Sequence, residues 1–273
     1  MDTSAVSIFF ASDDNYARPM AIALASVAAN TKSFVNFYIL ENKISKEIKD
    51  GIEEIKKNLN NFSIEYIPVD FNVFKNFPDR LWYSMNMYSR FLIPYVKENL
   101  DKALYLDSDI IVQEDIKPLY DVDLEGHAIG VAVEQYRTLQ DEAYFEEHSE
   151  NLGLDKNHIY FNSGMLLMDC EKWRKENILN KLADTIDVLK DKLKLPDQDA
   201  LNVLFENNYK SIENKYYIHY SGVRKPWQER DMPQADIFWK YAKLTPFYDE
   251  LYKNSLQGEF AYLRFWAKAK KKS

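Results

Sequence analysis

The sequence predicts an α/β fold in which a mixed, mostly parallel sheet is covered by helices on both faces. Two observations lead to this prediction. Short apolar, β-branched runs alternate with segments in which apolar residues recur at helical spacing, and this rhythm is typical of a parallel sheet. Hydrophobic residues make up 46% of the 273 residues and aromatic residues 15%, which is ample for a large buried core.

The first third of the chain is expected to alternate strands with helices. A polar turn follows the first apolar run, and Pro19 then suits the first turn of a helix. This order is typical of an α/β nucleotide-binding unit, but no glycine-rich loop follows the first strand, so neither a dinucleotide fingerprint nor a P-loop is supported. Ser45 is expected to cap the second helix. The expected strands cover residues 5–11, 34–40 and 63–69, and the expected helices cover residues 19–30 and 45–60.

The first polar turn offers side chains to a ligand. Asp13 and Asn15 follow the carboxyl end of the first expected strand, which is where ligands bind in sheets of this kind. Either side chain can hydrogen-bond a base or a ribose. The alternative is that they only cap the helix that follows.

The stretch from Lys102 to Val112 is an apolar, β-branched run that two carboxylates, Asp107 and Asp109, interrupt. We expect a buried strand that ends in a site. Side chains two residues apart on an extended chain lie on the same face, so these carboxylates can converge on one cation. A hard divalent ion with oxygen ligands is the ordinary partner for such a pair. The alternative is a turn with solvated acids.

The segments on either side of this stretch are less informative. A helix over residues 84–96 is expected to bring Arg90 to the acidic stretch, where it would meet an anion or a carboxylate. A solvated or salt-bridged arginine is the alternative. Residues 116–124 are expected as a turn-rich link, and residues 128–133 as a short strand.

Two later segments interrupt apolar runs with polar residues. Residues 157–169 are expected as a strand whose polar centre includes Gly164, which would let another chain or a ligand approach the backbone closely. Helices are expected over residues 170–177 and 178–193. The next helix opens with Asp-Gln-Asp at 197–199, either as part of a site or as an acidic first turn that suits the helix dipole.

A third polar cluster follows a β-branched and aromatic run near residue 217. The run ends in His219, and Gly222 and Lys225 come next, with Pro226 restricting the backbone. The imidazole can add a nitrogen ligand to a cation held by the two aspartates, while Gly222 and Lys225 can meet a diphosphate. A purely structural histidine is the alternative.

Composition and charge narrow the class of function. A net charge of −8 argues against general nucleic-acid binding, because the phosphate backbone would be repelled over most of the surface. The single cysteine, Cys170, cannot form an intramolecular disulfide, and the sequence shows no signal-peptide pattern, so we expect a reducing cytoplasm. The longest near-apolar run, residues 21–29, is far shorter than the roughly 20 residues that cross a bilayer.

The separate motifs occur together and in a known order. They resemble the family 8 glycosyltransferases, retaining enzymes with the GT-A fold that include bacterial lipopolysaccharide α-galactosyltransferases and glycogenin. The resemblance extends from residue 5 to about residue 230 and implies a Rossmann-like sheet and a hexosyltransferase that uses a UDP-sugar. The matching stretches are residues 11–16, 87–90, 104–109, 117–119, 160–164, 197–199, 219–222 and 225–227.

The resemblance also implies roles for single residues. Asp107, Asp109 and His219 would hold Mn²⁺, for which Mg²⁺ can substitute. Asp13 and Asn15 would contact uridine. The nucleotide and its diphosphate would lie against Ala11, Asp13, Asn15, Tyr16, Arg90, Asp107, Ser108, Gly222 and Lys225. Catalysis at the donor sugar would involve Arg90, Asn162, Asp197 and Gln198, with Asp107 nearby.

The implied reaction moves a hexose from a UDP-sugar to a glycan, glycolipid or glycoprotein acceptor. Asp197 and Gln198 match the galactosyl-transferring branch, which favours UDP-galactose over UDP-glucose. Breaking the sugar–diphosphate bond builds negative charge on the departing phosphate, so a cation helped by Lys225 would stabilise the transition state more than the ground state.

Two other classes of protein compete with this interpretation. A haloacid-dehalogenase-like phosphatase would use Asp107 as nucleophile and Asp109 as acid. That class normally has its motif on an early strand and a hydroxyl residue where Ile111 stands here, so the match is poor. A non-catalytic protein that binds nucleotide sugars or glycans would keep Asp13 and Asn15 but need not preserve metal ligands.

The ends of the resemblance define the expected domains. Residues 1–250 are expected to form the GT-A catalytic domain, and residues 251–273 a short basic, aromatic C-terminal segment. Its residues 260–272 are expected to contact an anionic membrane surface, with a disordered end as the alternative. Only residues 200–218 separate the Asp-Gln-Asp and histidine motifs, fewer than is usual in the family. Either the acceptor site is open or a loop is missing from the sequence.

Overall fold

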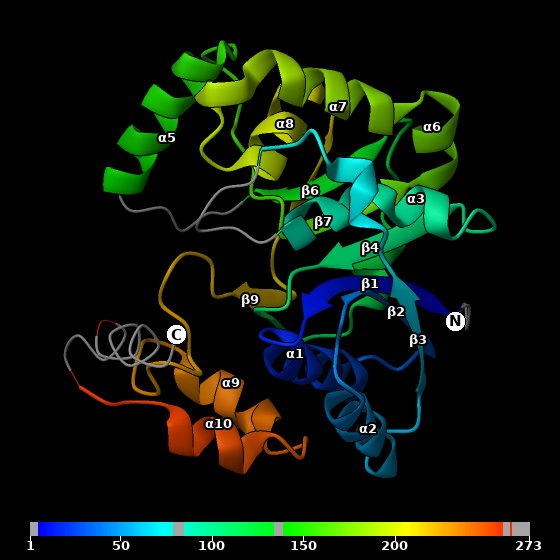
Figure 1. Ribbon diagram of the computed structural model, residues 1–273, viewed down its shortest axis with the longest axis vertical. Helices are drawn as coiled ribbons and strands as arrows, with labels where there is room; N and C mark the ends of the chain where they lie inside the picture. Colours follow the sequence, from blue (N-terminus) through cyan, green and yellow to red (C-terminus); the bar gives the residue numbers. More distant parts are fainter. Residues whose placement is uncertain (1–4, 79–84, 134–138, 259–262, 264–273) are drawn as a thin grey trace.

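The computed structural model describes residues 5–78, 85–133, 139–258 and 263. A seven-stranded sheet crosses the middle of the molecule in the order β3-β2-β1-β4-β7-β6-β8 (Figure 1). Four of its six neighbouring pairs are parallel, and only β7 runs antiparallel to its neighbours, so the predicted mixed, mostly parallel sheet is confirmed. The strands are β1 (Val6–Asp13), β2 (Val35–Asn42), β3 (Phe62–Pro68), β4 (Lys102–Leu106), β6 (Ile129–Val133), β7 (Met165–Asp169) and β8 (Lys210–Glu213).

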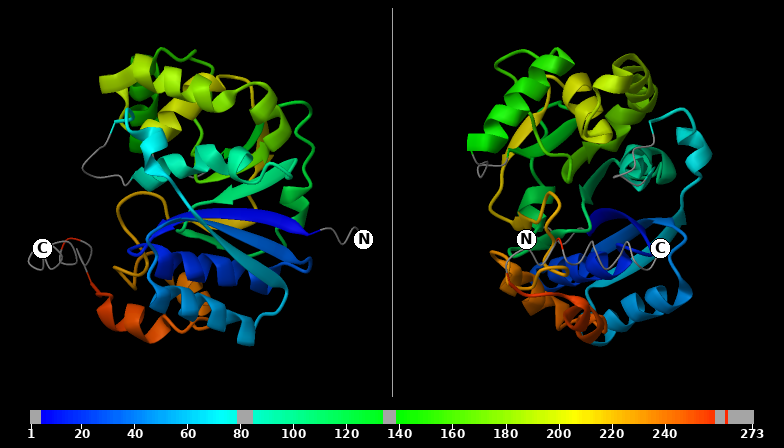
Figure 2. Two further views of the ribbon diagram at one scale, coloured as in Figure 1. Left: turned by 45° about the vertical axis from the view of Figure 1, so that its right-hand side comes forward. Right: turned by 60° about the vertical axis from the view of Figure 1, so that its left-hand side comes forward.

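Helices cover both faces of the sheet, as predicted (Figure 2). Alternate residues of β1 serve the two faces, because Ile8 and Phe10 pack with one apolar cluster and Phe9 with the other. The first cluster contains α1 (Ala17–Asn30) and α2 (Lys46–Glu54). The second contains α3 (Ile93–Val96), α6 (Cys170–Lys175), α7 (Ile178–Leu189) and α8 (Pro196–Leu204).

The C-terminal helices form a third apolar cluster against α1. Ile22 of α1 is buried there beside Phe238 and Trp239 of α9 (Ala235–Ala242). The following helix, α10 (Tyr248–Asn254), adds Leu251 to the edge of the cluster. The domain boundary expected at residue 250 therefore falls inside a helix that packs on the rest of the domain.

A two-stranded ribbon lies beyond the carboxyl end of β4. It pairs β5 (Ile110–Val112) with β9 (Tyr217–His219) in antiparallel register, and Ile110 faces His219. The single strand that we expected over Lys102–Val112 is therefore wrong, because the chain turns at the two aspartates and changes partners. The same pairing carries His219 to the acidic turn from more than one hundred residues away.

Other expected elements differ in length or type. Residues 85–92 form a 3-10 helix, η3 (Met85–Leu92), and only α3 is α-helical; Ser84 lies outside the described residues. Two features suit this change, since Pro94 cannot donate a backbone hydrogen bond and the guanidinium of Arg90 bonds the carbonyl of Met87. The second helix ends earlier than expected, in the 3-10 turn η1 (Ile55–Lys57).

The strand expected over residues 157–169 begins only at Met165. Residues 157–164 are irregular, because the side chain of Asn202 on α8 bonds both the N–H and the C=O of Phe161 and so replaces a strand partner. The expected strand over residues 128–133 is confirmed as β6, and the turn-rich link contains a short helix, α4 (Lys117–Tyr120). The sequence did not indicate α5 (Leu139–Leu152) or β8.

The short connection between the Asp-Gln-Asp motif and His219 comprises the rest of α8, β8 and the start of β9. The expectation of an open acceptor site or a missing loop stays a prediction. The tail at residues 260–272 lies outside the described residues, except for Leu263, which is exposed. Within the described part of the chain, no helix has both the length and the apolar character needed to cross a membrane.

Candidate active site

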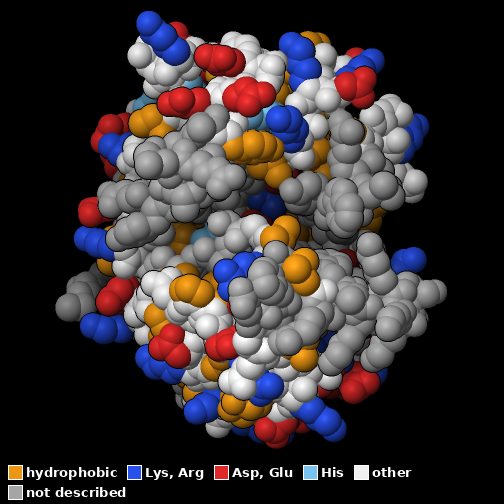
Figure 3. All heavy atoms as spheres, turned by 90° about the vertical axis from the view of Figure 1, so that its left-hand side faces the viewer, with side chains coloured by type: hydrophobic (Ala, Val, Ile, Leu, Met, Phe, Trp, Pro, Cys, Tyr) orange, Lys and Arg blue, Asp and Glu red, His pale blue; other side chains and the backbone are white. Residues whose placement is uncertain are grey.

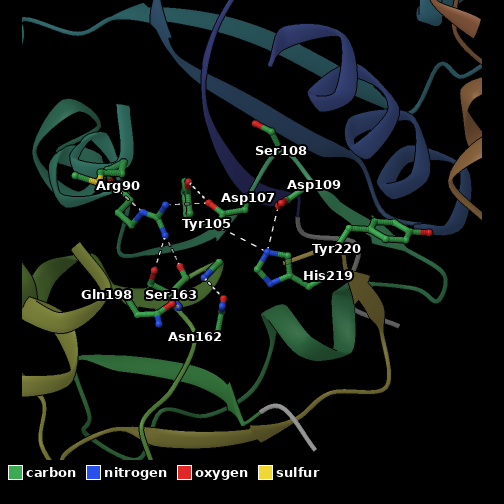
Figure 4. Close-up of polar contacts among 12 residues, drawn as sticks. Arg90, Tyr105, Asp107, Ser108, Asp109, Asn162, Ser163, Gln198, His219 and Tyr220 are labelled. Atoms are coloured by element: carbon green, nitrogen blue, oxygen red, sulfur yellow. Dashed lines mark hydrogen bonds and ion pairs between the residues drawn. The ribbon is translucent and has the colours of Figure 1, made fainter. Parts of the chain in front are cut away.

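The polar motifs meet at the carboxyl end of β4, around the turn that carries Asp107 and Asp109 (Figure 4). Backbone bonds hold this turn on both sides: the N–H of Asp107 donates to the carbonyl of Gly164 at 2.8 Å, and the N–H of Ile110 donates back to the carbonyl of Asp107 at 3.1 Å. The hydroxyl of Ser108 donates to the carbonyl of Ala11 at 3.2 Å and ties the turn to β1.

The two oxygens of Asp107 face different partners. Oδ1 accepts from Nη2 of Arg90 at 3.0 Å and from the hydroxyl of Tyr105 at 2.6 Å. Oδ2 faces Nε2 of His219 at 3.8 Å. The side chain is 25% exposed, so this second oxygen lies at the open side of the cluster.

Asp109 is arranged in the same way. Its Oδ2 accepts from the ammonium of Lys225 at 2.5 Å, and its Oδ1 lies 3.2 Å from Nε2 of His219. Burial opposes ionisation of Asp109, but the nearby charges of Lys225 and His219 outweigh it and hold the pKa of this carboxyl well below its usual range. Burial lowers the pKa of Lys225, but the charge and hydrogen bond of Asp109, together with other nearby acidic groups, outweigh burial and raise the pKa.

These contacts leave one oxygen of each aspartate and one imidazole nitrogen facing a common point. The ligand atoms of Asp107, Asp109 and His219 all lie within 4.8 Å of one another, and among the described residues they form the only such cluster of three. Gly164 helps to leave room, because a Cβ there would lie 2.4 Å from Cε1 of His219 and 2.8 Å from Oδ2 of Asp107. Two carboxylate oxygens and an imidazole nitrogen fit a divalent cation such as Mn²⁺.

Arg90 is the buried anchor of the site. Its Nη1 donates to the carbonyl of Ser163 at 2.6 Å and to its hydroxyl at 2.9 Å, and lies 3.3 Å from Oδ2 of Asp197. Its guanidinium also stacks 4.5 Å from the ring centre of Tyr105. Burial lowers the pKa of Arg90, but the charges of Asp107 and the other acidic groups around it together outweigh burial, and the pKa is raised. Arg90 therefore meets carboxylates at the acidic turn, and it does so through salt bridges to Asp107 and Asp197 inside the site.

The start of α8 closes this side of the site. Oδ2 of Asp197 accepts from the hydroxyl of Ser163 at 3.1 Å, and Oε1 of Gln198 accepts from the N–H of Ser163 at 3.1 Å. Oδ1 of Asn162 accepts from the N–H of Gly164 at 2.7 Å. Burial raises the pKa of Asp197, although the neighbouring Arg90 opposes the shift.

The N-terminal turn serves its own backbone. Oδ1 of Asp13 accepts from the N–H of Asn15 at 3.0 Å and of Tyr16 at 3.2 Å. This carboxylate therefore stabilises the turn before α1, which was the alternative to ligand binding. The ring of Tyr16 packs edge-on against Trp227, with ring centres 5.9 Å apart. Ala11 reaches the acidic turn through Ser108, as described above.

The loop after β9 closes the opposite side. Gly222 has φ +81°, a left-handed conformation that suits glycine, and allows the chain to turn back. Lys225 is then held between Asp109 and the carbonyl of Tyr220, to which its ammonium donates at 2.8 Å. The face of the molecule that carries these segments is hollowed between an upper and a lower half, with a Lys or Arg side chain at the floor (Figure 3).

The structure thus brings together the aspartates, His219 and Lys225. Arg90 joins them directly through Asp107, and Ser163 links Arg90 to Asp197 and Gln198. The sequence interpretation missed two residues. Tyr105 looked like an ordinary strand residue, and Ser163 was only part of a polar centre. The position of Tyr105 two residues before Asp107 was the available signal, since both side chains lie on the same side of the chain.

Comparison with known proteins assigns the chain to a family. The model of glycosyl transferase family 8 matches residues 7–217, well over half of the chain. The chain belongs to glycosyltransferase family 8. This assignment agrees with the resemblance expected from the motifs, and it excludes the haloacid-dehalogenase-like phosphatase.

Several relatives of this family 8 chain are glycosyltransferases by name. A putative glycosyltransferase of Haemophilus influenzae is 32% identical over 213 residues, which cover 77% of this chain but only 62% of that protein. A glycosyltransferase of Streptococcus pneumoniae, GlyF, is 28% identical, with 87% of this chain and 61% of that protein covered. A lipopolysaccharide 1,2-glucosyltransferase of Escherichia coli is 26% identical over 280 residues, which cover 90% of this chain and 80% of that protein.

Solved structures confirm the GT-A fold of the family 8 chain. The galactosyltransferase LgtC, in a crystal structure with donor and acceptor sugar analogues, superposes with a TM-score of 0.78 at 26% identity. The alignment covers 88% of this chain and 96% of LgtC. Glycosyltransferases with this fold usually use a nucleotide-sugar donor and a divalent metal, and the cluster of Asp107, Asp109 and His219 is suited to such a metal.

Proposed function

We propose that this chain transfers a hexose, galactose or glucose, from a UDP-sugar to a glycan, glycolipid or glycoprotein acceptor, with retention of anomeric configuration. One observation carries the proposal. Asp107 and Asp109 each have one oxygen held by a cationic side chain and the other turned to Nε2 of His219. The names of LgtC and of the Escherichia coli relative support both hexoses as candidates.

Asp107, Asp109 and His219 would hold Mn²⁺. Mg²⁺ would fit the two carboxylate oxygens but is less suited to the imidazole nitrogen. When bound, the ion would act as a Lewis acid that neutralises charge on the departing diphosphate. Arg90 and Lys225 orient both carboxylates for this role, because each cation binds the oxygen that does not face His219.

The other residues would bind the donor. Lys225 is buried beside Asp109, and its ammonium can turn from Asp109 to the diphosphate while Gly222 gives room for the loop to approach. Arg90, Asn162, Asp197 and Gln198 would surround the sugar from the opposite side. The uridine and its phosphates would lie along the N-terminal turn and the start of the acidic turn, against Ala11, Asp13, Asn15, Tyr16, Arg90, Asp107 and Ser108.

The chemistry of these side chains favours attack on the same face as departure. An amide is a poor nucleophile, so Gln198 is better suited to stabilise charge than to form a covalent intermediate. We therefore propose a short-lived oxocarbenium-like ion pair, in which the departing phosphate accepts the proton of the acceptor hydroxyl. Lys225 would stabilise that phosphate more as its charge grows.

A screen of UDP-sugars for Mn²⁺-dependent release of UDP tests this proposal. UDP-galactose or UDP-glucose is expected to be turned over slowly without an acceptor, because water can replace the acceptor hydroxyl. Tight binding of UDP-sugars with no release of UDP at any metal concentration would contradict the enzyme and favour a non-catalytic binding protein.

Cytoplasmic location and contact of residues 260–272 with an anionic membrane stay predictions. Cys170 is a buried free thiol whose pKa burial raises to about 12, so it is unreactive at neutral pH and compatible with a reducing compartment. Binding of the full chain to vesicles with and without phosphatidylserine would test the membrane contact.

A further inference from the structure

A second buried polar cluster, centred on the carboxylate of Asp199 in α8, lies next to the candidate site. Asp199 is fully buried, and its Oδ2 accepts from the backbone N–H of Lys194 at 2.7 Å and of Leu195 at 2.9 Å. Its Oδ1 accepts from Nε2 of His148 at 2.8 Å and from the hydroxyl of Tyr160. Both oxygens therefore have two donors each, which fills a carboxylate.

The direction of these hydrogen bonds is fixed by chemistry. An ionised carboxylate only accepts, so Tyr160 must donate its proton to Asp199 and keep an oxygen lone pair for another donor. Burial and then the charge of Asp199 raise the pKa of Tyr160 well above its usual value, so the hydroxyl keeps its proton. The lone pair accepts from Nε2 of Gln198 at 3.2 Å.

The other end of the Gln198 amide is fixed independently. Its Oε1 accepts from the backbone N–H of Ser163 at 3.1 Å, and a backbone N–H can only donate. The amide therefore has one satisfied orientation, with its NH₂ group toward Tyr160 and its carbonyl oxygen toward Ser163. Ser163 also holds Arg90 through its own carbonyl and hydroxyl oxygens. The carbonyl end of Gln198 thus lies on the side of the site (Figure 4).

We propose that Asp199, Tyr160 and His148 are positioning residues that set the direction of the Gln198 amide, so that its carbonyl oxygen and not its NH₂ group faces the donor sugar. This inference rests on the proposed function, in which Gln198 lies beside the anomeric carbon. Positive charge that develops on that carbon is stabilised by the negative end of an amide dipole and destabilised by its positive end.

The cost of the cluster supports a role in positioning. A buried carboxylate paired with a buried histidine contributes little net stability, since desolvation offsets the attraction, and apolar side chains of similar volume would pack as well. His148 reaches Asp199 from α5, and its ring packs against those of Tyr144 and Tyr160 with ring centres 6.0 Å away in each case. Its Nδ1 is buried with no hydrogen-bond partner among the described residues, so the imidazole serves Asp199 alone.

Asp199→Asn is the sharpest test, because it nearly preserves shape and reverses the chain of hydrogen bonds. The new side chain can keep accepting from the two backbone N–H groups with its oxygen. Its NH₂ group donates to the oxygen of Tyr160 and, with the imidazole proton moved to Nδ1, to Nε2 of His148. The Tyr160 proton then points at Gln198, whose amide must turn over. We expect kcat for UDP-sugar turnover to fall by at least about tenfold, with KM for the donor changed by less than about twofold.

Tyr160→Phe removes the acceptor of the Gln198 NH₂ group without reversing anything, so we expect a smaller fall in kcat, about fivefold, again at nearly constant KM. Tyr209→Phe is the matched control. Its hydroxyl donates to the carbonyl of Ile159 at 3.0 Å, in the same irregular segment, but takes no part in the chain to Gln198. Unchanged kcat in Asp199→Asn, or equal effects of Tyr160→Phe and Tyr209→Phe, would overturn the proposal.

A measurement on the unmodified protein covers the case in which a variant fails to fold. In protein labelled with ¹⁵N at glutamine side chains, the NH₂ protons of Gln198 should show nuclear Overhauser contacts to the ring protons of Tyr160. Contacts to the N–H of Ser163 in their place would refute the orientation of the amide. Absence of UDP-sugar turnover by the unmodified protein would refute the proposed function instead, so the two failures are distinguishable.

Discussion

Two polar clusters flank Ser163, and their carboxylate oxygens are satisfied in opposite ways. The open cluster contains Asp107, Asp109 and His219, and the saturated cluster contains Asp199, Tyr160 and His148. At the acidic turn, Asp107 and Asp109 each give one oxygen to a cation and turn the other to His219. Behind α8, all four acceptor directions of Asp199 are filled by internal donors. Within one buried polar region, saturation of hydrogen bonds therefore separates carboxylates that can bind a ligand from one that fixes geometry.

The two clusters also differ in how the negative charge of their carboxylates is compensated. Arg90 and Lys225 offset the two aspartates of the turn, but Asp197 adds a third carboxylate beside Arg90, so the open cluster keeps an excess of negative charge that suits a cation. Asp199 has backbone N–H groups, a hydroxyl and an imidazole as its donors. The saturated cluster needs no ion from outside.

The largest effect is expected from Asp109→Ala, which removes one open oxygen and leaves the ammonium of Lys225 buried without its partner. Mn²⁺-dependent release of UDP from a UDP-sugar should fall by at least about a hundredfold. Asp187→Ala is a control, because this exposed aspartate of α7 pairs with Lys190 at 3.2 Å and is not one of the residues of the candidate site. Full metal-dependent turnover by Asp109→Ala would mean that the open oxygens are not a metal site.

Arg90→Lys should have the next largest effect, because an ammonium cannot reach Asp107, Ser163 and Met87 at once. We expect about 2 kcal/mol of lost unfolding free energy, measured by urea denaturation, together with weaker donor turnover. Arg174→Lys is the matched control, since Arg174 likewise bonds backbone carbonyls, those of Pro94 and Leu100, away from the site. It should lose stability and keep its turnover. Equal loss of turnover in both variants would assign Arg90 a purely structural role.

Gly164→Ala tests the space in the open cluster. The new Cβ would displace the ring of His219 from the two aspartates, so we expect the Kd for Mn²⁺, followed by electron paramagnetic resonance, to rise about tenfold. Gly130→Ala is also crowded, with Cδ atoms of Ile212 and Leu124 at 2.8 Å, but it lies in the apolar core. That variant should lose stability without changing the Kd. An unchanged Kd in Gly164→Ala would place the metal away from His219.

Much of the fold could be predicted because regular strands leave a periodic apolar pattern. The first three strands lie within two residues of their expected ends. The break at the acidic turn left no such pattern, since the run is apolar on both sides of Asp107 and only pairing with β9 separates β5 from β4. Residues 157–164 were misassigned for a related reason: Tyr160 and Phe161 are buried like strand residues, but a side chain of α8 satisfies the backbone of Phe161.

The candidate site divides in the same way. The aspartates and His219 were recognisable because each interrupts an apolar run, and a charged or polar residue there is costly to bury unless it has a partner. His148 gave no such signal, because one histidine in an acidic, polar segment looks like a solvated residue. Its partnership with Asp199 depends on the packing of α5 against α8, which no local pattern in the sequence reports.

Asp197 lies between the two clusters and gives the smallest expected effect. Burial raises its pKa above the ordinary value of 3.8, and Arg90 partly cancels the shift. The folded state therefore holds this proton more tightly than the unfolded state, so the contribution of Asp197 to stability falls as pH rises from 3.8 through the folded-state pKa. Asp197→Asn has no such titration. Urea denaturation from pH 4 to pH 7 should show the variant gaining stability relative to the unmodified protein as pH rises. A difference that stays constant, or that falls with pH, would mean that the attraction of Arg90 outweighs burial and that the pKa of Asp197 is not raised on folding.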